Sequence, residues 1–147
     1  MTTPIILDEF KVHFSFNEVI ETSSCFIALT SDDILIMIDK PVTKTIEHKL
    51  ETIEVLERLG NNKPLPCIYD PSKMKGMEKG VRQLAKQHIN QKLSHVAILN
   101  PSPTFNVILA FLLKVDGIKI RHKAFSKLEK AINWVQHHKI SESTAVP

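Results

Sequence analysis

The side chains best suited to chemistry in this chain are its seven histidines, its two cysteines and one aspartate, Asp70. Metal sites need several ligands at fixed spacings, and the histidines show neither an HxxxH nor an HExxH pattern. His88 falls on an apolar helical stripe and His95 within a strand, where hydrogen-bonded structural roles are the usual ones. We therefore expect no metal ion and no other cofactor.

The two cysteines, Cys25 and Cys67, are far apart in sequence and lie in apolar segments. This arrangement excludes a disulfide framework and a CxxC zinc site, and it suits a reducing compartment. A thiol in a buried strand is normally inert, so Cys67 is not a candidate nucleophile. A Ser-His-Asp or Cys-His site remains open, because its members converge only in space. No residue is identified as catalytic.

Asp70 follows a buried strand, the position at which ligands gather in parallel sheets. A phosphoacceptor aspartate of the response-regulator kind would require a helix between the first two strands. The polar joint at residues 31–33 predicts a hairpin there instead. The favoured interpretation is that the Asp70 carboxylate caps the turn that continues through Pro71 and Ser72.

The elements that must position these residues follow from apolar periodicity. Phe10, Val12, Phe14 and Phe16 alternate with polar residues, which predicts a half-buried strand or an extended arm. Apolar runs predict strands at residues 25–30, 34–39, 65–69, 94–99 and 118–124. Helical spacing predicts helices at residues 43–59, 77–88, 104–115 and 128–135. Ser102 is placed to cap the third of these helices.

The resulting order, β-β-α-β-α-β-α-β-α, predicts one α/β domain whose mixed sheet begins with an antiparallel pair and is covered by helices. We expect an N-terminal strand or arm at residues 1–22, the domain at 23–140 and a flexible tail at 141–147. No secretory signal is visible, and the apolar stretch 105–113 falls short of the ~20 residues of a membrane helix. We expect a cytoplasmic protein without an integral membrane segment.

Several short segments complete this pattern: residues 63–70 (KPLPCIYD), 96–103 (VAILNPSP), 123–126 (KAFS) and 131–135 (AINWV). With the element order, they make the chain similar to STAS domains, found in anti-sigma-factor antagonists and sulfate transporters. The likeness is to small stand-alone bacterial proteins of the SpoIIAA-like kind. This resemblance implies protein docking without catalysis. In the antagonists a phosphorylated Ser controls docking, but the matching stretch here, residues 78–80, has no hydroxyl and Ser72 lies too early.

The resemblance places the docking surface on the turn after the strand expected at residues 65–69. Its candidate residues combine flexible apolar Met with Lys, a composition typical of adaptable interfaces and also of a solvated loop. The predicted partner-binding residues are Asp70, Ser72, Lys73, Met74, Lys75 and Met77.

The helix expected at residues 104–115 is apolar on all sides, so every side needs a cover. Three covers are open: a second copy of the chain, a small apolar ligand beneath the helix, or the arm at residues 10–16. The STAS superfamily resembles the lipid-carrying Sec14 fold, which keeps the ligand in consideration as a fold-level analogy. The face in question consists of Phe105, Ile108, Leu109, Phe111 and Leu112.

Charge divides unevenly along the chain. Residues 1–60 carry five Lys/Arg against eleven Asp/Glu, and residues 61–147 carry fourteen against five, giving the net +3. The basic residues form no stripe of the kind that tracks phosphates. Lys119, Arg121 and Lys123 share one strand face, which indicates either a site for an anion or, the favoured interpretation, an edge strand that deters aggregation. We expect a non-catalytic, self-associating interaction module with a protein partner and no nucleic acid. A carrier or sensor of a small apolar molecule is the alternative.

Overall fold

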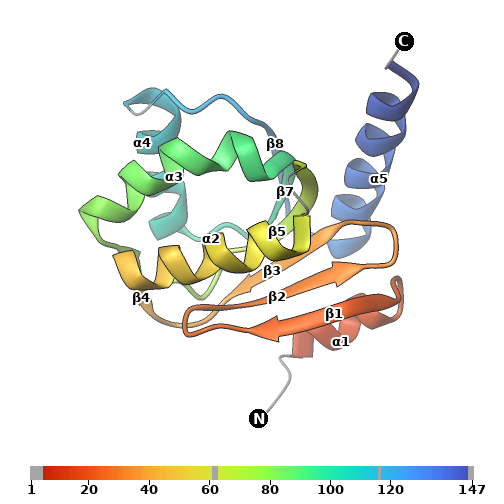
Figure 1. Ribbon diagram of the computed structural model, residues 1–147, viewed down its shortest axis with the longest axis horizontal. Helices are drawn as coiled ribbons and strands as arrows, with labels where there is room; N and C mark the ends of the chain where they lie inside the picture. The colour runs from red at the N-terminus through yellow and green to blue at the C-terminus, as the bar shows by residue number, and fades with distance from the viewer. Residues whose placement is uncertain (1–4, 61–62, 116, 146–147) are drawn as a thin grey trace.

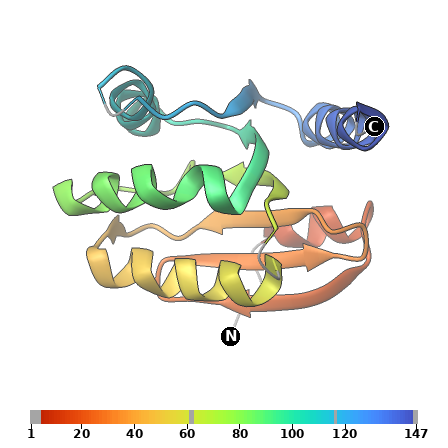
Figure 2. The ribbon, with the colours of Figure 1, turned by 45° about the horizontal axis from the view of Figure 1, so that its top comes forward.

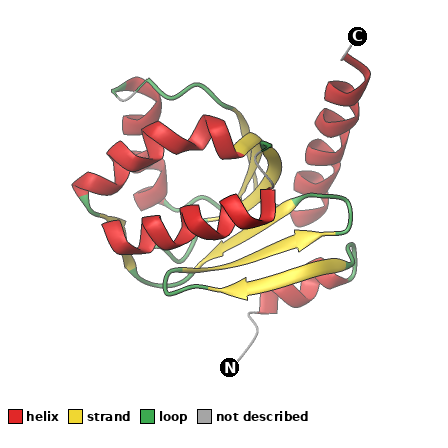
Figure 3. Ribbon diagram, viewed as in Figure 1, coloured by secondary structure: helices red, strands yellow, loops and turns green. Residues whose placement is uncertain are grey.

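The structure is a computed structural model that describes residues 5–60, 63–115 and 117–145. Its main sheet has six strands in the order β1-β2-β3-β5-β7-β8 (Figures 1 and 3). These strands are β1 (Phe16–Glu21), β2 (Cys25–Thr30), β3 (Leu35–Asp39), β5 (Leu65–Asp70), β7 (Leu93–Leu99) and β8 (Arg121–Phe125). The helices are α1 (Ile5–Lys11), α2 (Ile46–Gly60), α3 (Lys79–Lys92), α4 (Pro103–Lys114) and α5 (Leu128–Ala145).

The sheet is mixed, as expected. Strands β1, β2 and β3 pair antiparallel, whereas β3, β5, β7 and β8 pair parallel. The predicted hairpin between β2 and β3 is confirmed: Asp33 takes a φ of 62°, which aspartate tolerates. The Thr30 hydroxyl accepts hydrogen bonds from the backbone N–H groups of Asp32 and Ile34, which fixes the turn. A small parallel sheet of β4 (Thr43–Lys44) and β6 (Gly76–Met77) was not expected.

The prediction for the N-terminal segment is wrong. Residues 10–16 form no single strand: Phe10 belongs to α1, Phe14 lies in the following turn and Phe16 opens β1. Leu7 and Phe10 are spaced i and i+3, so one face of α1 carries both toward the sheet, and Phe14 follows from the segment after the helix. All three are buried.

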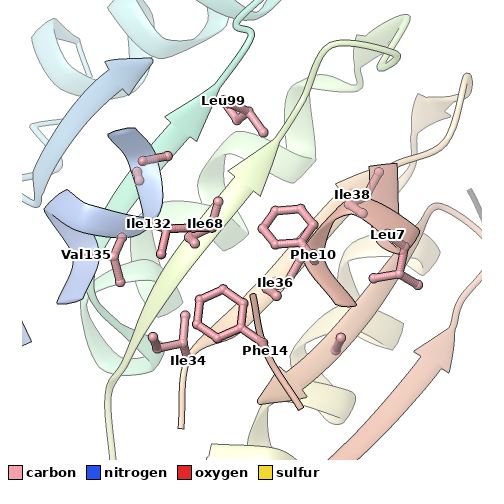
Figure 4. Close-up of a cluster of buried hydrophobic side chains, with 13 residues drawn as sticks. Leu7, Phe10, Phe14, Ile34, Ile36, Ile38, Ile68, Leu99, Ile132 and Val135 are labelled. Carbon is pink, nitrogen blue, oxygen red and sulfur yellow. The ribbon is translucent and has the colours of Figure 1, made fainter. Parts of the chain in front are cut away.

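One face of the sheet is covered by the first and last helices (Figure 4). Phe10 of α1 and Ile132 of α5 approach each other across β3 and β5, where Ile36 and Ile68 lie between them. His95 of β7 is fully buried on this side, and its Nε2 donates to the Val135 carbonyl at 3.2 Å. The expected structural role of His95 is thus confirmed.

The opposite face is covered by α2, α3 and α4, the helices that connect the parallel strands. Figures 1 and 2 show α2 and α3 side by side along the sheet. Helix α4 begins as expected, with the Ser102 hydroxyl accepting from the Phe105 N–H at 3.1 Å and Pro103 in the first turn. Helix α5 continues to Ala145, beyond the start expected for the tail; residues 146–147 lie outside the described part.

Candidate functional site

A cavity of about 120 Å³ lies between the sheet and helices α2, α3 and α4. Its apolar walls come from strands β3, β5 and β7 and from all three helices. The helical contributions include Leu56 of α2, Ala85 of α3 and Leu109 of α4. Ala85 is buried and contributes only a methyl group, so the middle of α3 leaves space above the strands. The other apolar residues of the wall are Met37, Ile53, Cys67, Met77, Ile89, Leu93, Val96, Ile98, Phe105, Leu112 and Ile120.

Near the carboxyl ends of β3 and β5, three polar side chains form a connected group. The Lys44 ammonium lies 2.8 Å from Asp39 Oδ1 and donates to the Tyr69 hydroxyl at 3.1 Å. The Tyr69 hydroxyl in turn donates to Asp39 Oδ2. Burial raises the pKa of Asp39, although Lys44 and Tyr69 act in the opposite direction. Burial, followed by the charge of Asp39, also raises the pKa of Tyr69 well above its usual value.

Lys49 and Ser24 line the same end of the cavity. Burial, followed by the nearby charge of Lys44, lowers the pKa of Lys49 to about 8, although part of the residue's surface stays exposed. Ser24 is 1% exposed, and its hydroxyl has no hydrogen-bond partner among the described residues. A buried hydroxyl without a partner costs about 1–3 kcal/mol, so this position favours a polar ligand atom.

Three cationic or potentially cationic side chains, His88, Lys92 and His122, line the other end of the cavity. Lys92 lies 3.6 Å from a carboxylate oxygen of Glu57, and His122 Nδ1 donates to the Ile120 carbonyl at 2.8 Å. The buried Nδ1 of His88 has no partner among the described residues, in contrast to the hydrogen-bonded role expected from the sequence. At this end, the Lys92 ammonium therefore already has an acidic partner within the protein, Glu57.

The residues of the predicted docking turn occupy very different environments. The Asp70 carboxylate accepts from the Ser72 N–H at 2.9 Å, which confirms its role as a turn cap. Met74 is 3% exposed and packs in the core, and its predicted contact with a partner stays a prediction. Met77 lies in β6 and packs partly buried against the same core. Ser72, Lys73 and Lys75 are exposed, and their contact with a partner remains a prediction.

Helix α4 is only partly covered, and the arm expected to cover it lies on the opposite face of the sheet. Phe105 and Leu112 are buried, and Ile108 and Leu109 pack partly buried against the core. Of the five residues predicted as an interface or ligand face, Phe105, Leu109 and Leu112 line the cavity and Phe111 is exposed. Their contact with a ligand or a second copy stays a prediction. The exposed stripe consists of Val107, Phe111 and Val115, at 59%, 44% and 66% exposure.

Sequence reasoning missed the polar end of the cavity, although one signal for it was present. Lys49, Ile53 and Leu56 are spaced i, i+4 and i+7, so Lys49 lies on the buried face of α2. The sequence pattern put Ile46 and Leu50 on the apolar face of this helix, but their side chains are 44% and 52% exposed. A lysine within an apolar stripe is the signal that could have revealed the site.

In the described ranges, no three His, Cys, Asp or Glu side chains are grouped so that they could hold a metal ion. The same ranges contain no helix that is both long and apolar enough to span a bilayer.

A mixed six-stranded sheet that begins with three antiparallel strands and carries its connecting helices on one face is a STAS-like arrangement, the SpoIIAA-like fold. A similar solved structure is that of an uncharacterized DUF3478 protein with a SpoIIAA-like fold from Shewanella loihica PV-4. The two chains share 15% identity at a TM-score of 0.53, over 92% of this chain and 98% of that one.

The chain belongs to the family described as a domain of unknown function, DUF7793, whose family model matches residues 27–139. A comparison with curated proteins finds no match.

Proposed function

We propose that the protein is a non-catalytic regulatory module that takes up a small, largely apolar molecule beneath α4 and acts as its sensor or carrier. The observation that carries this proposal is the cavity between the sheet and α2, α3 and α4. A cavity of similar size, about 150 Å³ and lined by apolar side chains, holds a benzene molecule. The two cysteines of the chain, Cys25 and Cys67, are free and buried, which supports a reducing location, the cytoplasm.

The test is the binding of a small neutral hydrocarbon, toluene, followed by NMR of the methyl groups of the full chain. Leu109, Leu112 and Ile98 line the cavity, so their methyl resonances are expected to shift in a saturable manner. Ile34 and Ile36 lie on the opposite face and are expected to remain unchanged. Shifts restricted to the opposite face, or no shifts at all, would remove the basis of the proposal.

A second candidate, self-association through α4, is favoured by the exposed stripe of Val107, Phe111 and Val115. These residues are spaced i, i+4 and i+8, so they form one continuous apolar strip on the helix. Sedimentation of the wild type is expected to show a dimer that Phe111→Asp converts to monomer. Val12→Asp is the control, because Val12 is 82% exposed but lies outside this strip. A monomeric wild type would contradict this candidate.

The exposed part of the turn after β5 is the proposed contact for a different protein. Lys73 and Lys75 present ammonium groups there, which favours an acidic partner surface. A double Lys73→Ala, Lys75→Ala variant is expected to lose a partner that the wild type captures from native lysate. The matched control is Lys63→Ala, since Lys63 is also exposed but precedes the strand. Undiminished capture by the double variant would move the contact elsewhere.

A further inference from the structure

The two ends of the cavity differ in how their charges are balanced. At the end near β3, Lys44 and Lys49 are the basic side chains, and Asp39 is the acidic partner of Lys44. Both carboxylate oxygens of Asp39 have partners, Lys44 and Tyr69, and Asp70 adds a second carboxylate near Asp39. No acidic side chain of the described residues forms a salt bridge with Lys49, so its ammonium has no direct anionic partner there.

Ser24 supplies an independent indication of a polar ligand atom at the same end. Its backbone is held in place, because its carbonyl accepts from the Lys40 N–H at 2.9 Å. Its hydroxyl is buried, lines the cavity and has no partner in the described part of the chain. A carboxylate oxygen would accept a hydrogen bond from this hydroxyl and a charge-assisted one from the Lys49 ammonium.

The protonation of Lys49 is compatible with such a contact at neutral pH. With a pKa of about 8, the ammonium form still predominates at pH 7. The groups around it include the ammonium of Lys44, the carboxylate of Asp39 and the thiol of Cys25. Since burial disfavours the ammonium, an anion beside it would raise the pKa of Lys49 again.

The opposite end offers a weaker case for a charged group. The buried Nδ1 of His88 has no partner among the described residues, but Lys92 already lies near Glu57, and His122 Nδ1 is occupied by the Ile120 carbonyl. Between the ends, the walls are apolar and the volume of about 120 Å³ limits the size of the occupant. Since a cavity of about 150 Å³ holds benzene, we expect the apolar part of the occupant to have about six carbon atoms.

We propose that the occupant is a small amphipathic carboxylate whose carboxylate group lies against Lys49 and Ser24 and whose ring or short chain fills the apolar space under α4. This inference rests on the proposed function, because it assigns the chemistry of the molecule held in the same cavity.

The test compares two carboxylates, hexanoate and benzoate, with the matched neutral alcohols 1-hexanol and benzyl alcohol. Their binding to the full chain at pH 7 is measured by titration calorimetry and by NMR. The wild type is expected to bind each carboxylate about tenfold or more tightly than its alcohol, since a charge-assisted hydrogen bond is gained. In Lys49→Met this preference is expected to disappear, because the carboxylate loses its charge-assisted hydrogen bond.

Three further variants separate the contributions. Lys49→Arg retains the charge and is expected to retain the preference for carboxylates. Ser24→Ala is expected to reduce carboxylate affinity severalfold, because one hydrogen bond is lost. Lys86→Met, which changes an exposed lysine of α3, is the matched control and is expected to have no effect.

The outcomes distinguish this inference from the proposed function. Equal binding of carboxylates and alcohols, unchanged in Lys49→Met, would overturn the inference and leave the apolar site intact. Loss of the preference in His88→Gln or Lys92→Met, with Lys49→Met unaffected, would also overturn it, because the carboxylate would then lie at the other end. If neither carboxylates nor alcohols bind, the proposed function itself fails.

Discussion

Replacing Ala85 by leucine is expected to stabilise the protein, which is unusual for an enlargement of a buried residue. Ala85 is 4% exposed and forms part of the cavity wall on α3. Leucine adds three carbon atoms, and each buried carbon contributes about 0.8 kcal/mol. Ordering of the longer side chain opposes this by about 0.5–1 kcal/mol, and leucine and alanine differ little in helix propensity. The net gain is therefore about 1.5–2 kcal/mol.

The matched control is the same substitution at Ala131, on α5. Ala131 is fully buried in the cluster on the opposite face of the sheet and does not line the cavity beneath α4. Extra carbons in a closely packed core cost about 1–3 kcal/mol. Ala131→Leu is therefore expected to lower the free energy of unfolding.

Urea denaturation measures both variants against the wild type, and thermal melting provides a second readout. For a chain of this size, the gain in Ala85→Leu corresponds to an increase in Tm of about 3–6 °C. The same variant is expected to lose toluene binding, because leucine occupies the space. Equal destabilisation by the two substitutions would show that α3 packs without a cavity, and the reasoning about the site would be refuted.

Three further predictions concern individual contacts. Ser102→Ala removes the hydroxyl that caps α4 and is expected to lower the free energy of unfolding by about 1 kcal/mol in urea; an unchanged midpoint would contradict the capping role. Asp39→Ala leaves the largely buried Lys44 ammonium without its carboxylate and is expected to cost about 3–5 kcal/mol, part of which Asp39→Ala combined with Lys44→Met recovers. Lys49 has a pKa of about 8 in the folded chain and 10.5 as its ordinary value, so its contribution to stability is present above pH 10.5 and is lost as the pH falls through 8. The free energy of unfolding is therefore expected to rise by up to about 3 kcal/mol between pH 8 and 10.5 in the wild type, beyond any rise in Lys49→Met, and urea titrations at the two pH values measure this difference.

The central part of the fold was predictable because its signals are local. The parallel strands β3, β5 and β7 are short apolar runs bounded by polar or proline-containing turns, and the helices α2 and α3 have a regular apolar spacing. The N-terminal segment was not predictable in this way. Phe10 and Phe14 fit both a strand period of two and the i, i+4 spacing of a helix, and the choice depended on contacts with α5, more than a hundred residues later.

The cavity could not be predicted, because it results from how three helices fit together over one sheet. The apolar character of α4 indicated that something must cover it, but the pattern alone did not separate its buried side from its exposed stripe. Met74 shows the same limit, since its burial depends on the placement of a loop against the core. Lys49 was different: its spacing with Ile53 already placed an ammonium group on the buried face of α2.

The packing of α1 and α5 on the same face of the sheet has a consequence for biosynthesis. Phe10 is made more than a hundred residues before Val135, yet both belong to one buried cluster over Ile36 and Ile68 (Figure 4). While the chain is still being translated, this face of the sheet lacks α5 and exposes isoleucine side chains to the surroundings. Completion of the fold therefore waits until α5 has left the ribosome, and nascent chains stalled before that point are the forms most prone to aggregate or to engage chaperones.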